Sequence, residues 1–511
     1  MLKTIQIPKS PKLDATEPTK KTVYRSCHFF IFEHARTRRN IYMSYIETDT
    51  TKKNSIAKKN ATSKLVELSY AINIDEIEEE TLIKATTILS DGIGVLLHGI
   101  DHHTVQVIAK YLHDQEPKNG VKVIGHNFNA TLADAAFIYG CAIHSNDFEP
   151  MFLPPTHAVS PILASLIAIA QKKKINGKTF LKAFIAGIQF EAGLREGARR
   201  SDTSAAINEK HFPFDKHGFH PPGTVGPLGS ALASSIALGL TQDECMMAIG
   251  YAASRSSGIS GNIGSMTKAT HCGNAARSGL EAALLCSYGL TASPQILETG
   301  SGWTDVFGGN NFNFETLIYG MKNLSCFTAP GFAIKKWPAH TAMQVAINSA
   351  LQLHKARHES GPIQIKVPVF KYCNRPFPKD TDEARFSFQY NVAVSLIDGK
   401  INDDSHSEEK LHSSTVQEYL SRIELVLDQD IPRDFGNMDV IISLDSGKSN
   451  KSDSWPGHWK TPMTAEDKLD KFKNCCSNFW DSKTAEYYDH LINNIATKDN
   501  LKLILEGLNI L

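Results

Sequence analysis

The sequence has no excess of either charge, few cysteines and no long hydrophobic run. Lys plus Arg and Asp plus Glu both number 54 in 511 residues, so the chain as a whole is not a basic nucleic-acid wrapper. The nine cysteines form no CxxC pair, which argues against a zinc ribbon or a disulfide framework and favours reduced thiols in an intracellular compartment. Because no stretch of about 18 apolar residues occurs, we expect no transmembrane helix.

The rest of the composition is that of an ordinary globular protein. Hydrophobic residues make up 41% and charged residues 21%, which excludes a disordered or collagen-like chain. The length allows roughly two to four domains.

The positive charge is concentrated at the start of the chain, where residues 1–62 hold 13 Lys/Arg and only 5 Asp/Glu. This segment has no apolar run followed by a small-residue cleavage site, so a secretory signal is not expected. It fits a basic flexible extension, a mitochondrial presequence, or an upstream extension with Met43 as the true start. We therefore expect a mitochondrial location, or otherwise a cytoplasmic one. Aromatic residues do not alternate with the basic ones, so no nucleic-acid partner is predicted.

Hydrophobic periodicity predicts a mainly helical protein with an α+β insertion. The pattern is helical from about 63 to 325, with an apolar run from Phe180 to Leu194 that predicts a buried helix. Thr241 and Glu244 have the spacing of a capping box at a helix start. Alternating apolar residues predict strands around 363–367, 423–427 and 440–444.

These patterns divide the chain into four segments. We expect a basic extension over 1–62, a helical domain over 63–327, a smaller α/β domain over 328–457, called the lid below, and a return to the helical domain over 458–511.

Four polar stretches interrupt apolar, Gly/Pro-rich sequence and predict a pocket rich in His and Lys. They cover residues 144–149 with 154–157, residues 217–223, residues 261–271, and residues 335–340 with 372–376. The third stretch is expected to run into a helix from about Asn274. Lysine ammoniums and protonated histidines favour anionic groups, and histidine moves protons near pH 7. The pattern therefore favours acid–base chemistry on a small polycarboxylate.

Other site chemistries have weaker support in the sequence. There is no GxxxxGK[ST] loop for phosphate, and no GxGxxG follows a strand to hold a nicotinamide or flavin. Ser265 and Lys268 form an SxxK pair, but the KTG partner of serine acyl-enzymes is missing. His144, Asp147, His157 and His220 are an alternative set of metal ligands, although their spacing fits no standard zinc pattern.

The same stretches resemble the MmgE/PrpD family, which includes 2-methylcitrate dehydratases and cis-aconitate decarboxylases. The resemblance covers residues 63 to about 480. In the helical domain it is carried by AIHSNDF at 142–148, FHPP at 219–222, and Thr267-Lys268 followed by His271 and GNAA at 273–276. In the lid and just beyond it, it is carried by WPAH at 337–340, NRPFP at 374–378, SFQY at 387–390 and GHW at 457–459. These later motifs are most similar to the itaconate-forming decarboxylase branch of animals.

The resemblance implies a homodimer with an active site between the helical domain and the lid, and neither a metal nor an organic cofactor. The site residues that it implies are Asp147, His157, His220, Lys268, Lys335, His340 and Tyr372. Where the family pattern has a threonine, this chain has Met151, whose thioether is a poorer partner for a substrate. Met151 is therefore included among the candidate substrate-binding residues.

The expected reaction is decarboxylation of the tricarboxylate cis-aconitate to itaconate and CO₂. Lys268, Lys335 and His340 would form a positive clamp, and His220 would stabilise the developing negative charge. His157 is the expected general acid, oriented by Tyr372 or Asp147, since a nearby carboxylate favours a protonated histidine. Two alternatives stay open: a dehydratase acting on 2-methylcitrate or a related hydroxy acid, and a non-catalytic carboxylate-binding homologue.

Overall fold

The computed structural model describes residues 53–198, 218–309, 311–328, 331–356, 360–497 and 499–508. Most of the predicted basic extension, residues 1–52, lies outside these described residues, as does His217 of the second polar stretch. Residues Ala57–Leu511 form one compact unit. Helices dominate that unit and strands are few and short, which confirms the prediction of a mainly helical fold with a smaller α/β part.

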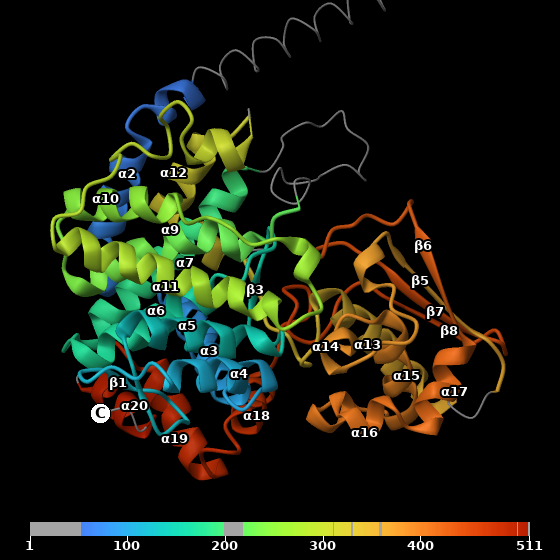
Figure 1. The fold of residues 1–511 in the computed structure, drawn as a ribbon. Coiled ribbons are helices and arrows are strands. Elements are labelled where there is room, and N and C mark those ends of the chain that lie inside the picture. Colours follow the sequence, from blue (N-terminus) through green and yellow to red (C-terminus); the bar gives the residue numbers. More distant parts are fainter. Residues whose placement is uncertain are drawn as a thin grey trace, which may run out of the picture. The chain divides into compact units, whose positions relative to one another are not determined.

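The first part of the unit is a bundle of helices (Figure 1). They are α2 (Ala61–Ala71), α3 (Glu79–Gly99), α4 (His103–His113), α5 (Leu132–Ser145), α6 (Val159–Lys172), α7 (Gly177–Gly197), α9 (Pro221–Leu238), α10 (Gln242–Ala253), α11 (Thr267–Ser287) and α12 (Phe314–Asn323). α11 packs closely against α5 and α9. A Cβ on Gly279 of α11 would lie only 2.4 Å from Ser230 Cβ of α9, so the two helices approach closely because the residues between them are small.

Two local predictions for these helices are confirmed and one is wrong. Thr241 caps α10, where its hydroxyl accepts from the Glu244 N–H while Glu244 accepts from the Thr241 N–H. α7 is buried along nearly its whole length. α11, however, begins at Thr267 and not near Asn274. The glycines at 261 and 264 suggested a longer loop, but Lys268 has buried partners and lies in the first turn of the helix.

The lid contains a four-stranded sheet with helices against it (Figure 1). Its strands are β5 (Ile363–Pro368), β6 (Ile423–Asp428), β7 (Val440–Leu444) and β8 (Ser449–Ser452), in the order β6-β5-β7-β8. β5 and β6 are parallel, and the other two pairs are antiparallel. The helices of the lid are α13 (Thr341–Leu353), α14 (Thr381–Ala384), α15 (Phe388–Asp398), α16 (Glu408–Leu411) and α17 (Ser414–Arg422). The three strands predicted from alternation are therefore confirmed.

The chain then returns to the helical part through α18 (Ala465–Cys475), α19 (Ser482–Asn493) and α20 (Asn500–Gly507). α18 and α19, drawn in red in Figure 1, pack against α3. One hydrophobic core accordingly draws residues from 61–327 and from 472–508, whereas a second core lies within 333–455. The four-segment division of the chain stays a prediction.

The two chain crossings between the cores lie side by side. The Ile334 N–H donates to the Gly457 carbonyl at 2.9 Å, and Trp455 Nε1 donates to the Ile334 carbonyl at 2.9 Å. Two short ribbons complete the fold: β1 (Val121–Lys122) pairs with β2 (Asn129–Ala130), and β3 (Met151–Phe152) pairs with β4 (Phe332–Ala333). Among the described residues, no helix is both long and apolar enough to cross a membrane.

Candidate active site

The site is built around Asp147, which follows the end of α5 in a left-handed backbone conformation with φ of 50°. Its side chain is buried between two ammonium groups. Lys268, in the first turn of α11, donates to Asp147 Oδ2 at 2.7 Å. Lys335, which follows β4, donates to Oδ1 and also to the Asp147 carbonyl at 2.7 Å. Burial alone would raise the pKa of Asp147, but Lys268 and Lys335 together hold it well below its ordinary value.

Lys268 also donates to the buried ring of His144, at 2.7 Å from its Nε2 atom. An ammonium group can only donate, so Nε2 is the acceptor and the ring proton lies on Nδ1. That proton points to the Glu149 carboxylate, which contacts Nδ1 directly. Burial, reinforced by the charge of Lys268, lowers the pKa of His144 to about 3. His144 is therefore a neutral link between Lys268 and Glu149.

Glu149 joins this link to His157. Its Oε1 atom lies 2.7 Å from His157 Nδ1 and 3.4 Å from the Ser160 hydroxyl. The first distance is that of an ion pair, but the imidazole ring is not oriented for a hydrogen bond to this oxygen. Burial would raise the pKa of Glu149, but the neighbouring His144, His157 and Lys335 hold it well below its ordinary value.

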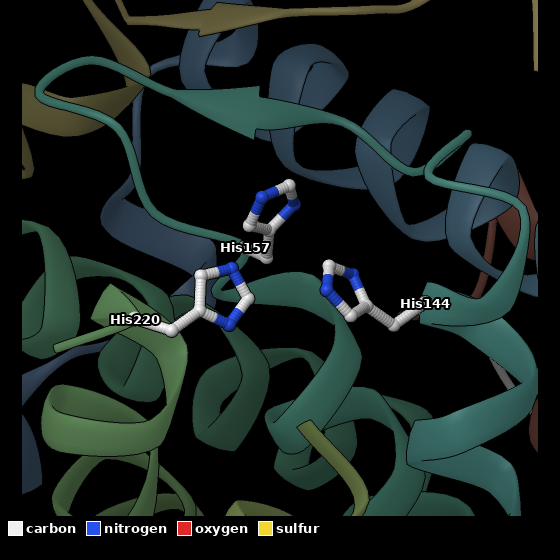
Figure 2. A group of neighbouring side chains, drawn as sticks. All are labelled: His144, His157 and His220. Atoms are coloured by element: carbon white, nitrogen blue, oxygen red, sulfur yellow. The ribbon is translucent and has the colours of Figure 1, made fainter. Parts of the chain in front are cut away.

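His220 and His271 form a further pair of imidazoles, with their Nδ1 atoms 3.0 Å apart. His220 immediately precedes α9, and its ring centroid lies 5.5 Å from that of His144 and 5.8 Å from that of His157. Figure 2 shows the three rings gathered around a common space. Burial lowers the pKa of His220 well below its ordinary value and that of His271 to about 4, so both rings are neutral near pH 7.

The lid contributes His340 and Tyr372. His340 caps α13, with its Nδ1 accepting from the Ala342 N–H at 3.2 Å, and its Nε2 lies 3.2 Å from the Tyr372 hydroxyl. Because Nδ1 accepts, the neutral ring carries its proton on Nε2 and donates to Tyr372. Burial lowers the pKa of His340 to about 3, and burial raises the pKa of Tyr372 well above its ordinary value. The phenol therefore keeps its own proton, which it can donate to a bound molecule.

Met151 lies in β3, where it is buried and paired with Ala333 of β4. The hydroxyl of Thr341, the residue after His340, lies 3.0 Å from its sulfur. The thioether is thus enclosed at the contact between the helical part and the lid.

The predicted residues are placed together to different degrees. Asp147, Lys268 and Lys335 are in direct contact, His157 reaches them through Glu149 and His144, and Tyr372 contacts His340 and not His157. Sequence reasoning placed His144, Glu149 and His271 in the polar stretches of the pocket but did not include them among the site residues of the expected reaction. The polar stretch at 144–149 was the available signal, but it does not reveal which carboxylate meets which ring.

Two alternative chemistries can be tested on this geometry. Ligand atoms of His144, His157 and His220 lie within 4.8 Å of one another, as do those of Asp147, Glu149 and His157. Both nitrogens of His144 are already bonded, however, and one of them faces the Lys268 ammonium, so the arrangement suits an anion better than a metal cation. The SxxK reading also fits poorly, since the Lys268 ammonium bonds Asp147 and His144, and Ser265 donates to the Asn262 carbonyl.

Comparison with known proteins gives matches over most of the chain. The family model described as the MmgE/PrpD N-terminal domain matches residues 63–315, and the MmgE/PrpD C-terminal domain matches residues 337–495. Cis-aconitate decarboxylase of Mus musculus is 30% identical over 449 residues, 84% of this chain and 89% of the relative. The enzyme of the same name from Homo sapiens is 28% identical, over 87% of this chain and 94% of the relative. The mitochondrial 2-methylcitrate dehydratase of Yarrowia lipolytica is 24% identical, over 76% of this chain and 75% of the relative.

Proposed function

The chain belongs to the MmgE/PrpD family, and on that premise we propose that it is a carbon–carbon lyase that converts cis-aconitate to itaconate and CO₂. The observation that carries this proposal is the buried pair of ammonium groups on Asp147, with His157 close by. The similarity to mouse and human proteins named cis-aconitate decarboxylase supports the choice of substrate.

The two lysines are suited to hold substrate carboxylates. Each ammonium has three N–H donors. Lys268 uses two of them on Asp147 and His144, and Lys335 uses two on Asp147. Among the described residues neither makes a further hydrogen bond, so each has a third donor that could serve a substrate carboxylate; Lys268 is slightly exposed, whereas Lys335 is fully buried and would have to be uncovered first. Asp147 fixes the two donors in place before the substrate binds.

His340 contributes as a donor and not as a cation. With a pKa lowered to about 3 by burial, its ring is neutral at physiological pH and donates to Tyr372. Tyr372 then offers its own O–H to a substrate carboxylate. The sequence-based expectation that His340 belongs to a positive clamp is therefore corrected: its ring is neutral, and the positive charge comes from Lys268 and Lys335.

Decarboxylation of cis-aconitate consumes one proton. The bond to the leaving carboxylate breaks, its electron pair stays on an allylic carbanion, and CO₂ departs. His157 donates the proton that forms the new C–H bond, and His220 stabilises the negative charge that develops on the remaining carboxylate. In other enzymes, an electrostatic donor of that kind lowers the activation free energy by roughly 3–4 kcal/mol.

A dehydratase is the second candidate, because the same lysines and histidines could expel water and one relative is named 2-methylcitrate dehydratase. Purified full-length protein would be incubated with cis-aconitate and, separately, with 2-methylcitrate, and the products followed by NMR. Itaconate with CO₂ would establish the decarboxylase, whereas dehydration of 2-methylcitrate would replace it. Thermal protection by a dicarboxylate without turnover would favour a binding protein that has kept the fold.

We also propose a homodimer, on the family resemblance, and a mitochondrial location, on the basic residues 1–62. Sedimentation velocity of the full chain and imaging of the tagged full chain test these two points.

A further inference from the structure

Glu149 and His157, whose side chains are in contact, each carry one polar atom without a hydrogen bond to a described residue. Glu149 is fully buried, and its Oε1 takes the contacts with His144, His157 and Ser160. Its second oxygen, Oε2, has no hydrogen-bond partner among the described residues. His157 Nδ1 lies 2.7 Å from Oε1 but is also without a hydrogen bond there, because the ring is turned away from it.

An unpaired buried polar atom costs stability, so one on each of two side chains in contact points to an interaction that completes when the site is used. Catalytic hydrogen bonds are often poorly aligned in the absence of substrate and tighten when it binds. A turn of the His157 ring would direct its Nδ1–H at the Glu149 carboxylate. The other ring nitrogen, Nε2, would then face the substrate.

We propose that Glu149 is the positioning residue of the general acid: its carboxylate holds His157 from the Nδ1 side, so that the proton is given up from Nε2 and then restored by water. This proposal rests on the proposed function for its role in turnover. In each cycle, the Nε2–H bond breaks as the C–H bond forms. The neutral ring then takes one proton from solvent, which is the proton that decarboxylation consumes.

The carboxylate is held ready for this role from its other side. His144 is neutral and donates to Glu149, while its Nε2 accepts from Lys268. The series of hydrogen bonds from Lys268 through His144 to Glu149 therefore fixes the carboxylate without neutralising its charge. The Glu149 carboxylate therefore presents a negative charge to the His157 ring.

Other charged or titratable groups also face His157, and the test has to separate Glu149 from them. They are Asp147, His144, His220 and His340. Asp147 is already bonded to two lysines, and the three histidines are neutral because burial lowers the pKa of each. Glu149 is thus the one carboxylate among these groups that is not paired with lysine.

The first test needs no turnover. The protonation of His157 would be followed by NMR in full-length protein with labelled histidine, with the signal assigned by its loss in H157Q. Replacing Glu149 by Gln keeps the size and removes the charge. We expect the His157 midpoint in E149Q to fall by about one pH unit or more, and in E149D to stay near that of the wild type. An unchanged midpoint in folded E149Q would overturn the proposal.

E191Q controls for replacing a buried carboxyl group by an amide, because Glu191 on α7 is also fully buried but burial raises its pKa well above the ordinary value, so that no charge is removed. It should leave the His157 midpoint unchanged. The wild-type chain supplies a second readout in case E149Q does not fold. Above the midpoint, the remaining ring proton should stay on Nδ1, facing Glu149, as nitrogen chemical shifts report. A proton on Nε2 would contradict the proposal.

The second test uses the reaction. In E149Q we expect kcat to fall at least tenfold at pH 7 with little change in KM. As pH rises, kcat of E149Q should begin to decline at a lower pH than kcat of the wild type. A wild-type chain that makes no itaconate would refute the proposed function, while the NMR result would still decide whether Glu149 positions His157.

Discussion

At the scale of single residues, His157 is the group on which the proposed chemistry depends most directly. Replacing it by Ala removes the proton donor while leaving Lys268 and Lys335 on Asp147. We expect kcat with cis-aconitate to fall by about 10² or more, the usual cost of losing an acid–base group. The exposed His412, changed to Ala, is a control that should keep the wild-type rate. Near-normal turnover in folded H157A would remove His157 from the mechanism.

His340 makes a separate prediction about stability and pH. Burial lowers its pKa to about 3 in the folded chain, against about 6.5 when unfolded. Between these pH values the unfolded chain binds a proton that the folded chain does not, so stability falls as pH falls. The loss approaches about 1.4 kcal/mol per pH unit for this group. H340N keeps a side chain that can cap α13 but does not titrate, so its urea midpoint should decline less between pH 6 and pH 4. If the urea midpoints of H340N and the wild type declined equally between pH 6 and pH 4, His340 would not be the source of this pH dependence.

The residue scale is also where sequence reasoning reached its limit. Asp147 and Lys268 could be found because a family motif carries each of them, and Lys335 could be found because it lies two residues before the WPAH motif at 337–340. The carboxylate that contacts His157 could not be found, because Asp147 and Glu149 are only two residues apart and the sequence does not tell which of them meets the histidine. Only burial and the positions of the two lysines separate them: the ammonium groups occupy Asp147 and leave Glu149 to the histidines.

At the scale of elements, α18 supports the loop that carries Asp147 and Glu149. Its Lys471 forms a buried ion pair with Asp91 of α3 at 2.7 Å and donates to the Phe148 carbonyl at 3.0 Å. Phe148 lies between Asp147 and Glu149, so a helix from the end of the chain holds the loop that carries both carboxylates.

Replacing Lys471 by Met should therefore destabilise the protein strongly, by about 3–5 kcal/mol, because Asp91 is left buried without its partner. The double variant D91N/K471M should recover part of that loss. Urea unfolding of the wild type, both single variants and the double variant measures the coupling. Strictly additive effects would mean that the pair does not contribute as a unit.

Elements with a strong pattern were predictable, and elements fixed by tertiary contacts were not. The strands at 363, 423 and 440 alternate apolar and polar residues, and the Thr241 cap is a local interaction. β8 (Ser449–Ser452) is polar, so only its pairing with β7 makes it a strand. The start of α11 was misplaced because the glycine-rich sequence before it does not reveal that Lys268 has buried partners.

At the scale of the whole molecule, the site depends on two cores meeting correctly. Asp147, His157, His220 and Lys268 come from the helical part, whereas Lys335, His340 and Tyr372 come from the lid. The contacts of Lys335 with Asp147 and of Thr341 with Met151 cross between them. The site is therefore complete only when the lid lies against the helical part.

The lid nevertheless has the features of a unit that folds by itself. Its core lies entirely within residues 333–455, and its two ends are joined by the hydrogen bonds of Ile334 with Gly457 and Trp455. A segment of about 130 residues is long enough to bury a stable core, and inserted domains commonly have neighbouring ends.

We therefore expect a fragment of residues 331–462 to unfold in urea with a single sharp transition, and to show the circular dichroism of a mixed α/β protein. A second truncation, residues 1–462, should not unfold in a single sharp transition, because it lacks the residues from 472–508 that complete the helical core. A broad transition in the fragment would mean that the lid needs the helical part in order to pack. In that case the two cores would be one folding unit, and the site would form together with the rest of the protein.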